Sequence, residues 1–112
     1  MSYDIKIDSF GTKRYYVNKV LHREGGPAIE YANGDKEWYK NGKLHREDGP
    51  AFEYAGGIKE WYLNGKIHRE DGLAVENASG DKMWYLNDKC YGDGDKFTNK
   101  SWIKFVKTLI FS

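Results

Sequence analysis

The sequence predicts a mainly β protein built from hairpin repeats and ended by one C-terminal α-helix. A 23-residue unit occurs three times, at residues 21–43, 44–66 and 67–89. The first two units share 18 of 23 residues, and the second and third share 15. Within each unit, glycine-containing turn signals separate short segments rich in aromatic and β-branched residues, a pattern typical of hairpins. The fixed period indicates that each unit buries its apolar surface against its neighbours.

Length and composition indicate one small cytoplasmic domain, residues 1–112. The net charge of +1, from 18 basic and 17 acidic residues, argues against binding to nucleic acid or to an anionic membrane. Aromatic residues make up 16% of the chain, which argues against disorder. A single cysteine excludes an internal disulfide and fits a reducing compartment. Neither a signal-peptide core nor an 18-residue apolar run is present.

The turn signals set the expected strand register. If Asn33-Gly34 is a two-residue loop, Ile29 faces Trp38 and Ala28 faces Tyr39, so that large apolar residues meet Trp on one face. The same rule pairs Phe52 with Trp61 in the second unit and Val75 with Trp84 in the third. This register also places Glu30 opposite Glu37, which is unfavourable. Either an arginine lies between these glutamates or the register slips, and both alternatives stay open.

The two ends of the chain read as caps. Residues 1–20 supply a capping strand and a half repeat, in which Tyr15 aligns with Trp38 and Asn18 with Asn41. Residues 90–112 supply a linker and a helix, with Thr98 as N-cap and Phe97 and Trp102 as a hydrophobic staple. Helical spacing gives this helix an apolar face opposite three lysines and predicts that it covers the last unit or the Trp face, the apolar residues being Trp102, Phe105, Val106, Leu109 and Ile110.

The stretch NGKLHREDGPAFEYAGG at residues 41–57 resembles MORN-type repeats, which are also 23 residues long. The resemblance is closer to a divergent branch with the signature LHREDGPA and EWYLNGK, which is common in phages, giant viruses and some bacteria. It covers residues 11–89. It implies an elongated, twisted antiparallel sheet of successive hairpins, a viral or phage source, and no catalytic residues. The longer HREDGPA stretch, residues 45–51, departs from the shorter HGxG of ordinary MORN units.

Three residue types invite a catalytic or metal interpretation. His22, His45 and His68 recur once per unit, about 9–10 Å apart if a unit adds two strands, which is too far for one zinc ion, so we expect a structural role. Cys90 falls in an apolar slot of the repeat and is expected to be a small buried side chain. The recurring glutamates form a ladder on an open sheet without a cleft. We therefore expect no enzyme, no metal and no cofactor.

We expect a non-enzymatic protein-binding module that uses one aromatic and charged face of the sheet. Exposed Tyr or Trp beside Arg is the composition of a binding hot spot. The resemblance extends this expectation to a small viral or phage protein that binds a host or viral protein and, in one version, inhibits a host or defence protein such as a CRISPR component. Alternatives are a nucleotide-sequestering protein, a self-assembling scaffold or homo-oligomer, and a lipid-headgroup binder. The candidate binding residues are Tyr39, Tyr62, Tyr85, Trp38, Trp61, Trp84, Arg23, Arg46, Arg69, Lys36, Lys59 and Lys82.

Overall fold

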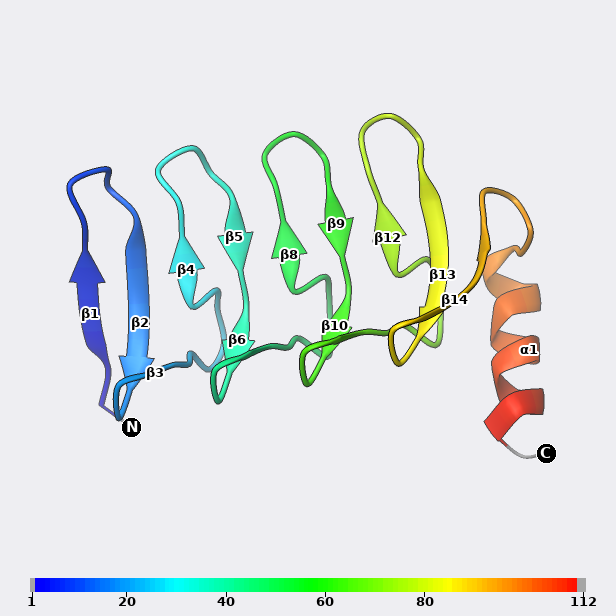
Figure 1. The fold of residues 1–112 in the computed structure, drawn as a ribbon, viewed down its shortest axis with the longest axis horizontal. Helices are drawn as coiled ribbons and strands as arrows, with labels where there is room; N and C mark the ends of the chain where they lie inside the picture. Colours follow the sequence, from blue (N-terminus) through cyan, green and yellow to red (C-terminus); the bar gives the residue numbers. More distant parts are fainter. Residues whose placement is uncertain (1, 111–112) are drawn as a thin grey trace.

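A computed structural model describes residues 2–110 as an elongated row of antiparallel hairpins with a helix at the C-terminal end (Figure 1). The molecule measures 46 × 32 × 18 Å, and the mainly β fold with one C-terminal helix is confirmed. Nine strands follow one another in the order β1 (Asp4–Ile7), β2 (Lys13–Val17), β4 (Ile29–Glu30), β5 (Lys36–Glu37), β8 (Phe52–Glu53), β9 (Lys59–Glu60), β12 (Val75–Glu76), β13 (Lys82–Leu86) and β14 (Lys89–Asp93).

Shorter pairings complete each unit beside this main sheet. Strand β3 (Val20–Leu21) pairs with β2. Two further hairpins extend the first two units, β6 (Tyr39–Lys40) with β7 (Lys43–Leu44) and β10 (Tyr62–Leu63) with β11 (Lys66–Ile67). The helix α1 (Asn99–Ile110) lies beside the last hairpin in Figure 1, and no helix of the described residues is long and apolar enough to cross a membrane.

Two kinds of turn connect the strands, although both contain Asn-Gly in the first unit. At Asn41-Gly42 both residues have positive φ, 53° and 80°, as a two-residue type I′ turn requires. At Asn33-Gly34 only Gly34 has positive φ, 97°. Its N–H donates to the Tyr31 carbonyl at 3.0 Å, and the Tyr31 N–H donates to the Asp35 carbonyl at 2.9 Å. The connection at Asn33-Gly34 is therefore a three-residue loop with a glycine bulge.

The extra loop residue shifts the register by one, so the predicted pairing is wrong. Ile29 lies opposite Glu37 rather than Trp38, and Glu30 lies opposite Lys36. The same shift recurs in the next two units, where Phe52 faces Glu60 and Val75 faces Met83. Because side chains alternate between the two faces of a strand, a register slip of one residue places Ile29 on the same face as Glu37 rather than Trp38. Two ways to relieve the Glu30–Glu37 conflict were open from the sequence, and the structure adopts the register slip.

The shifted register produces a charge ladder across seven strands, from β2 to β13. Each glutamate of the ladder has a lysine opposite it on both neighbouring strands. Opposite charges in these positions stabilise a sheet, whereas like charges would destabilise it. The ladder runs Lys13, Glu30, Lys36, Glu53, Lys59, Glu76, Lys82.

The helix α1 begins as its sequence predicts and packs on the last unit along part of its predicted apolar face. The Thr98 hydroxyl accepts a hydrogen bond from the Ser101 N–H at 3.1 Å. In return, the Thr98 N–H donates to the Ser101 hydroxyl at 2.9 Å. The Phe97 and Trp102 rings are 5.0 Å apart. Trp102 and Val106 are buried against Trp84, so the helix covers the last unit, whereas Ile110 is 57% exposed. The predicted apolar face is thus buried only along its first part.

Candidate binding surface

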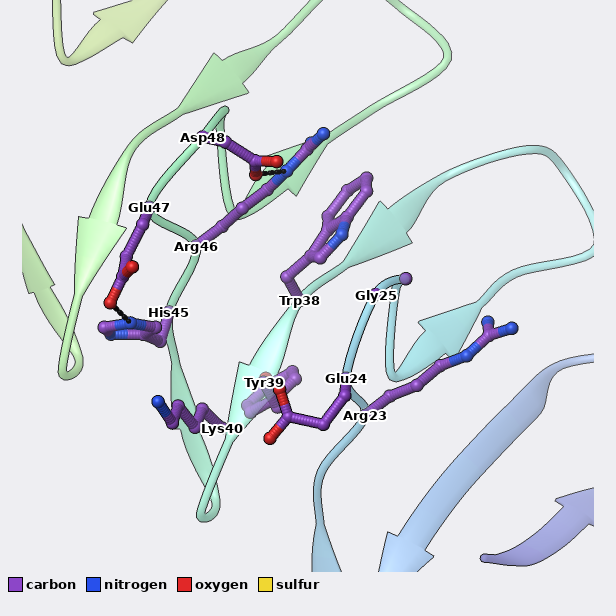
Figure 2. Close-up of a pocket in the computed structure, with 11 residues that line it drawn as sticks. Arg23, Glu24, Gly25, Trp38, Tyr39, Lys40, His45, Arg46, Glu47 and Asp48 are labelled. Carbon is purple, nitrogen blue, oxygen red and sulfur yellow. Dashed lines mark hydrogen bonds and ion pairs between the residues drawn. The ribbon is translucent and has the colours of Figure 1, made fainter. Parts of the chain in front are cut away.

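Each repeat arginine reaches back to the aromatic ring of the preceding unit. The guanidinium carbon lies 3.9 Å from the ring centre of Tyr15 for Arg23, 4.0 Å from that of Trp38 for Arg46, and 3.8 Å from that of Trp61 for Arg69. Figure 2 shows Arg46 extended over Trp38. Such contacts combine cation–π attraction with dispersion. They tie consecutive units together, with Tyr15 of the half repeat taking the place of the tryptophan.

The HREDGPA stretch and its equivalents, HREGGPA at residues 22–28 and HREDGLA at residues 68–74, form a tight loop around each arginine. Arg46 Nη1 donates to the Pro50 carbonyl at 3.1 Å. A Cβ added to Gly49 would lie 2.6 Å from Arg46 Cζ, so any larger residue at this position would displace the guanidinium. Equivalent bonds join Arg23 to the Pro27 carbonyl and Arg69 to that of Leu73. The spacing from Arg to Gly to Pro therefore has a structural cause.

Carboxylates complete the shell of these arginines. Arg23 contacts Glu30 at 2.7 Å and Arg46 contacts Glu53 at 3.1 Å. Arg46 and Arg69 also pair through Nε with the aspartate two residues on, at 3.1 and 2.8 Å. The three arginine side chains are only 21–26% exposed. They act as internal ties between units.

The histidines hold the next turn along the array. Nδ1 of His22, His45 and His68 accepts the N–H of the residue 19 positions on, at 2.9–3.0 Å, those residues being Asn41, Asn64 and Asn87. The other ring nitrogen lies 2.9–3.4 Å from a glutamate two residues on. These hydrogen bonds give the histidines a structural role. Within residues 2–110 no group of three or more His, Cys, Asp or Glu side chains is arranged to hold a metal ion.

The tyrosines lie on the opposite face from the tryptophans. Tyr39 and Tyr31 both donate to the Glu37 carboxylate, at 2.9 and 2.8 Å, and Tyr62 donates to Glu60 at 2.9 Å. Glu37 is 7% exposed, so these hydroxyls satisfy a nearly buried carboxylate. Burial, and then the hydrogen bond to Glu37, raises the pKa of Tyr31 to about 12.

The same two causes raise the pKa of Tyr39 and of Tyr62, whose hydroxyl partner is Glu60. Burial is also the main cause that raises the pKa of Tyr85, whose hydroxyl lies 3.8 Å from the Met83 sulfur. All three tyrosines remain half-buried. Figure 1 shows a single layer of hairpins with α1 at its end, so the helix does not cover this face. We call this surface, with Tyr31, Tyr39, Tyr54, Tyr62 and Tyr85, the tyrosine face.

The twelve predicted residues therefore divide between two faces. Lys36, Lys59 and Lys82 are exposed and belong to the charge ladder on the side of the tryptophans and arginines. Trp84 differs from Trp38 and Trp61 because Gly92 stands where an arginine would follow, and α1 covers its ring instead.

Cys90 is exposed, so the expectation of a buried thiol is wrong. The carbonyls of Leu21, Leu44 and Ile67, which occupy the same slot, each bind the turn of the next unit. No further repeat unit follows Cys90, so no turn of a next unit packs at this position and the thiol is exposed. The sequence could have signalled this, since the repeat ends at Lys89.

Two grooves, which the sequence did not predict, lie between successive HREDGPA loops. Groove 1, about 350 Å³, lies between the Arg23 and Arg46 loops, and Trp38, Tyr39 and Lys40 also line it (Figure 2). Groove 2, about 270 Å³, is its equivalent one unit on and is lined by Trp61 and Leu63. Both grooves are open, and acidic side chains lie along their rims.

Comparison of the chain with protein-family models, with curated proteins and with solved structures finds no match. The assignment of a function therefore rests on the surfaces described above.

Proposed function

We propose that this chain is a non-enzymatic protein-binding module and that it binds its partner through the tyrosine face. The observation that carries the proposal is the division of the two faces. The arginines and tryptophans are engaged within the fold, whereas the tyrosines form a wide surface that α1 leaves uncovered. Tyrosine supplies large contact area at a low entropic cost, and protein interfaces are enriched in it.

The carboxylates beneath the tyrosines add specificity to this surface. Glu37 and Glu60 orient the hydroxyls of Tyr31, Tyr39 and Tyr62, so the rings present a defined shape before a partner arrives. Ordering the side chains in advance reduces the entropy lost on binding. The resemblance to the viral repeat branch adds that the partner is a host or defence protein and that binding inhibits it.

Nucleotide sequestering, a competing hypothesis, would need free arginines and an aromatic platform. Each arginine is already stacked on a ring and bonded to a backbone carbonyl. A nucleotide would have to displace these contacts. The geometry therefore favours a protein partner.

The test is capture of a partner from a lysate of the host cell, followed by native mass spectrometry. The wild type should carry a stoichiometric protein, and a triple variant with Tyr39→Ala, Tyr62→Ala and Tyr85→Ala should lose it while its circular dichroism stays that of folded protein. The matched control, Lys36→Ala with Lys59→Ala and Lys82→Ala, alters the other face and should retain the partner. Capture that survives the tyrosine changes would refute the proposal.

Self-association is a second candidate function, favoured by the exposed edge strand β1. Ile5 and Ile7 are 50% and 67% exposed, and β1 has a neighbour on one side only. In an antiparallel pairing centred on Ile5, Asp4 of one copy would face Lys6 of the other. Asp4→Lys or Lys6→Asp alone should then dissociate a dimer, and the double exchange should restore it, as measured by sedimentation. A wild type that sediments as a monomer at every concentration would exclude this function.

A further inference from the structure

The third unit shows what can occupy the groove beside an HREDGPA loop. Trp102 of α1 inserts there and is fully buried. Its Nε1 donates to the Arg69 carbonyl at 3.0 Å. Its ring centre lies 5.4 Å from that of Trp84 and 6.0 Å from that of Tyr91, and Leu86 packs against the same cluster. The chain therefore carries its own example of a helix anchored by one tryptophan.

Groove 2 lies at the equivalent place one unit earlier, where Arg69 stacks on the Trp61 ring and no indole of the described residues is inserted. The four positions that surround Trp102 correspond, 23 residues earlier, to Arg46, Trp61, Leu63 and His68. All four line groove 2. In the part of the chain that the structure describes, no donor bonds the Arg46 carbonyl, which is the equivalent of the Trp102 acceptor. The indole N–H of an incoming tryptophan could donate to this carbonyl as Trp102 donates to the Arg69 carbonyl.

The rim of groove 2 indicates the charge of its occupant. Glu47, Glu70 and Asp71 line it, and their side chains are 77%, 54% and 70% exposed. Arg46 and Arg69 line it too, but their side chains are only 23% and 21% exposed, so the more accessible charges are acidic. The helix α1, which fills the equivalent site, has three lysines and no acidic residue. Charge complementarity of this kind steers association and suppresses wrong partners.

We propose that groove 2 binds a basic helical segment of a partner protein, anchored by one tryptophan. The volume of about 270 Å³ suits a single large side chain, since pockets for whole small ligands begin at roughly 300 Å³. Arg69 shares the Trp61 ring, so the incoming indole has less apolar contact than Trp102 has on Trp84. Binding at groove 2 is accordingly weaker than the docking of α1. This surface is separate from the tyrosine face.

Groove 1 provides an internal comparison. Lys40 stands there in the position of Leu63, so the lining of groove 1 carries a charge where that of groove 2 has an apolar side chain. Because each residue already occurs at the equivalent place in a neighbouring unit, exchanging them is compatible with the fold. The exchange should move the binding site from one groove to the other.

The experiment titrates the intact chain with a synthetic peptide of residues 96–110, followed by calorimetry. An isolated helix of this length is only marginally formed in water, so we expect a dissociation constant of about 10–100 μM for one site. The chain's own α1 keeps its groove because its effective concentration is in the millimolar range. Leu63→Lys should weaken binding at least about tenfold, a loss of roughly 1.4 kcal/mol. Lys40→Leu should add a second site.

Control measurements separate this mode from others. A peptide with Ala in place of Trp should not bind, and a chain with Lys36→Ala, outside both grooves, should bind the peptide like the wild type. Absence of binding at about 1 mM peptide, or binding that Leu63→Lys leaves unchanged, would overturn the proposal. If the chain alone dimerises and Leu63→Lys abolishes the dimer, the occupant is α1 of a second copy and the assignment to a partner protein is wrong. Loss of the tyrosines should leave peptide binding intact, so the two proposals fail separately.

Discussion

Replacing Arg46 with alanine tests whether the repeat arginines hold the array together or serve a partner. The substitution removes the stack on Trp38, which is worth about 1 kcal/mol, and the charged hydrogen bond to the Pro50 carbonyl, worth about 1.5 kcal/mol. The ion pairs with Glu53 and the 89% exposed Asp48 add about 0.5 kcal/mol. The expected loss in the free energy of unfolding is therefore about 3 kcal/mol, or roughly 12 °C in Tm for a chain of this size.

Urea denaturation of a short series of variants measures this loss. Arg46→Lys keeps the charge but loses the planar stack, and we expect it to lose about half as much stability. Asp48→Asn, which changes only an exposed partner, should cost about 0.5 kcal/mol or less. If Arg46→Ala costs less than about 1 kcal/mol, the guanidinium is not a structural tie and the reasoning on the loop is refuted.

Three further predictions follow from the same contacts. Trp102→Ala should cost about 3–5 kcal/mol and release α1, seen as fast amide exchange along the helix; retained protection would contradict the packing described here. Gly49→Ala should cost stability in the wild type but little in an Arg46→Ala background, because the added methyl meets the guanidinium; additive losses in a double-mutant cycle would show that the two groups do not interact. Stability should fall as pH rises above 10, because tyrosines of the unfolded chain ionise there while the raised pKa of Tyr39 and Tyr62 keeps them protonated in the folded chain; the double Tyr→Phe variant should lose less, and an unchanged pH profile would contradict this assignment.

The sequence predicted the architecture because the repeat, the turns and the helix cap are local signals. Thr98, Phe97 and Trp102 take the roles that their spacing indicates. The glycine-containing turn signal at Asn41-Gly42 also forms a turn, of type I′. Each of these features depends on residues within a few positions of one another, so composition and spacing suffice to predict it.

The dipeptide Asn-Gly alone could not predict the strand register, because Asn33-Gly34 and Asn41-Gly42 have the same sequence but form different turns. A signal did exist in the third unit, where Ser79 stands in the place of Asn33. A type I′ turn needs positive φ at both central residues, and serine rarely adopts it. The structure agrees, since Gly80 has φ 92° and Ser79 is not among the residues with positive φ. Comparing equivalent turn positions across units would have favoured the longer loop.

The division of the two faces also required tertiary information. Arg23, Arg46 and Arg69 have the composition of a hot spot, yet their ring partners belong to the preceding unit, 8 residues earlier in the chain. The hairpin at the junction of two units brings them together, as at Asn41-Gly42, where the His45 N–H donates to the Trp38 carbonyl at 3.0 Å. The grooves arise from the loops of successive units.

The charge ladder has a consequence for how such an array can change its length. Every unit presents glutamate on its leading strand and lysine on its trailing strand, so any two units meet with opposite charges. The arginine of each unit likewise needs only an aromatic ring in the one before it. Recombination could therefore insert or delete a whole unit without creating a mismatched junction, and both caps would still fit. The length of the tyrosine face is set by the number of copies, while the chemistry of each junction stays the same.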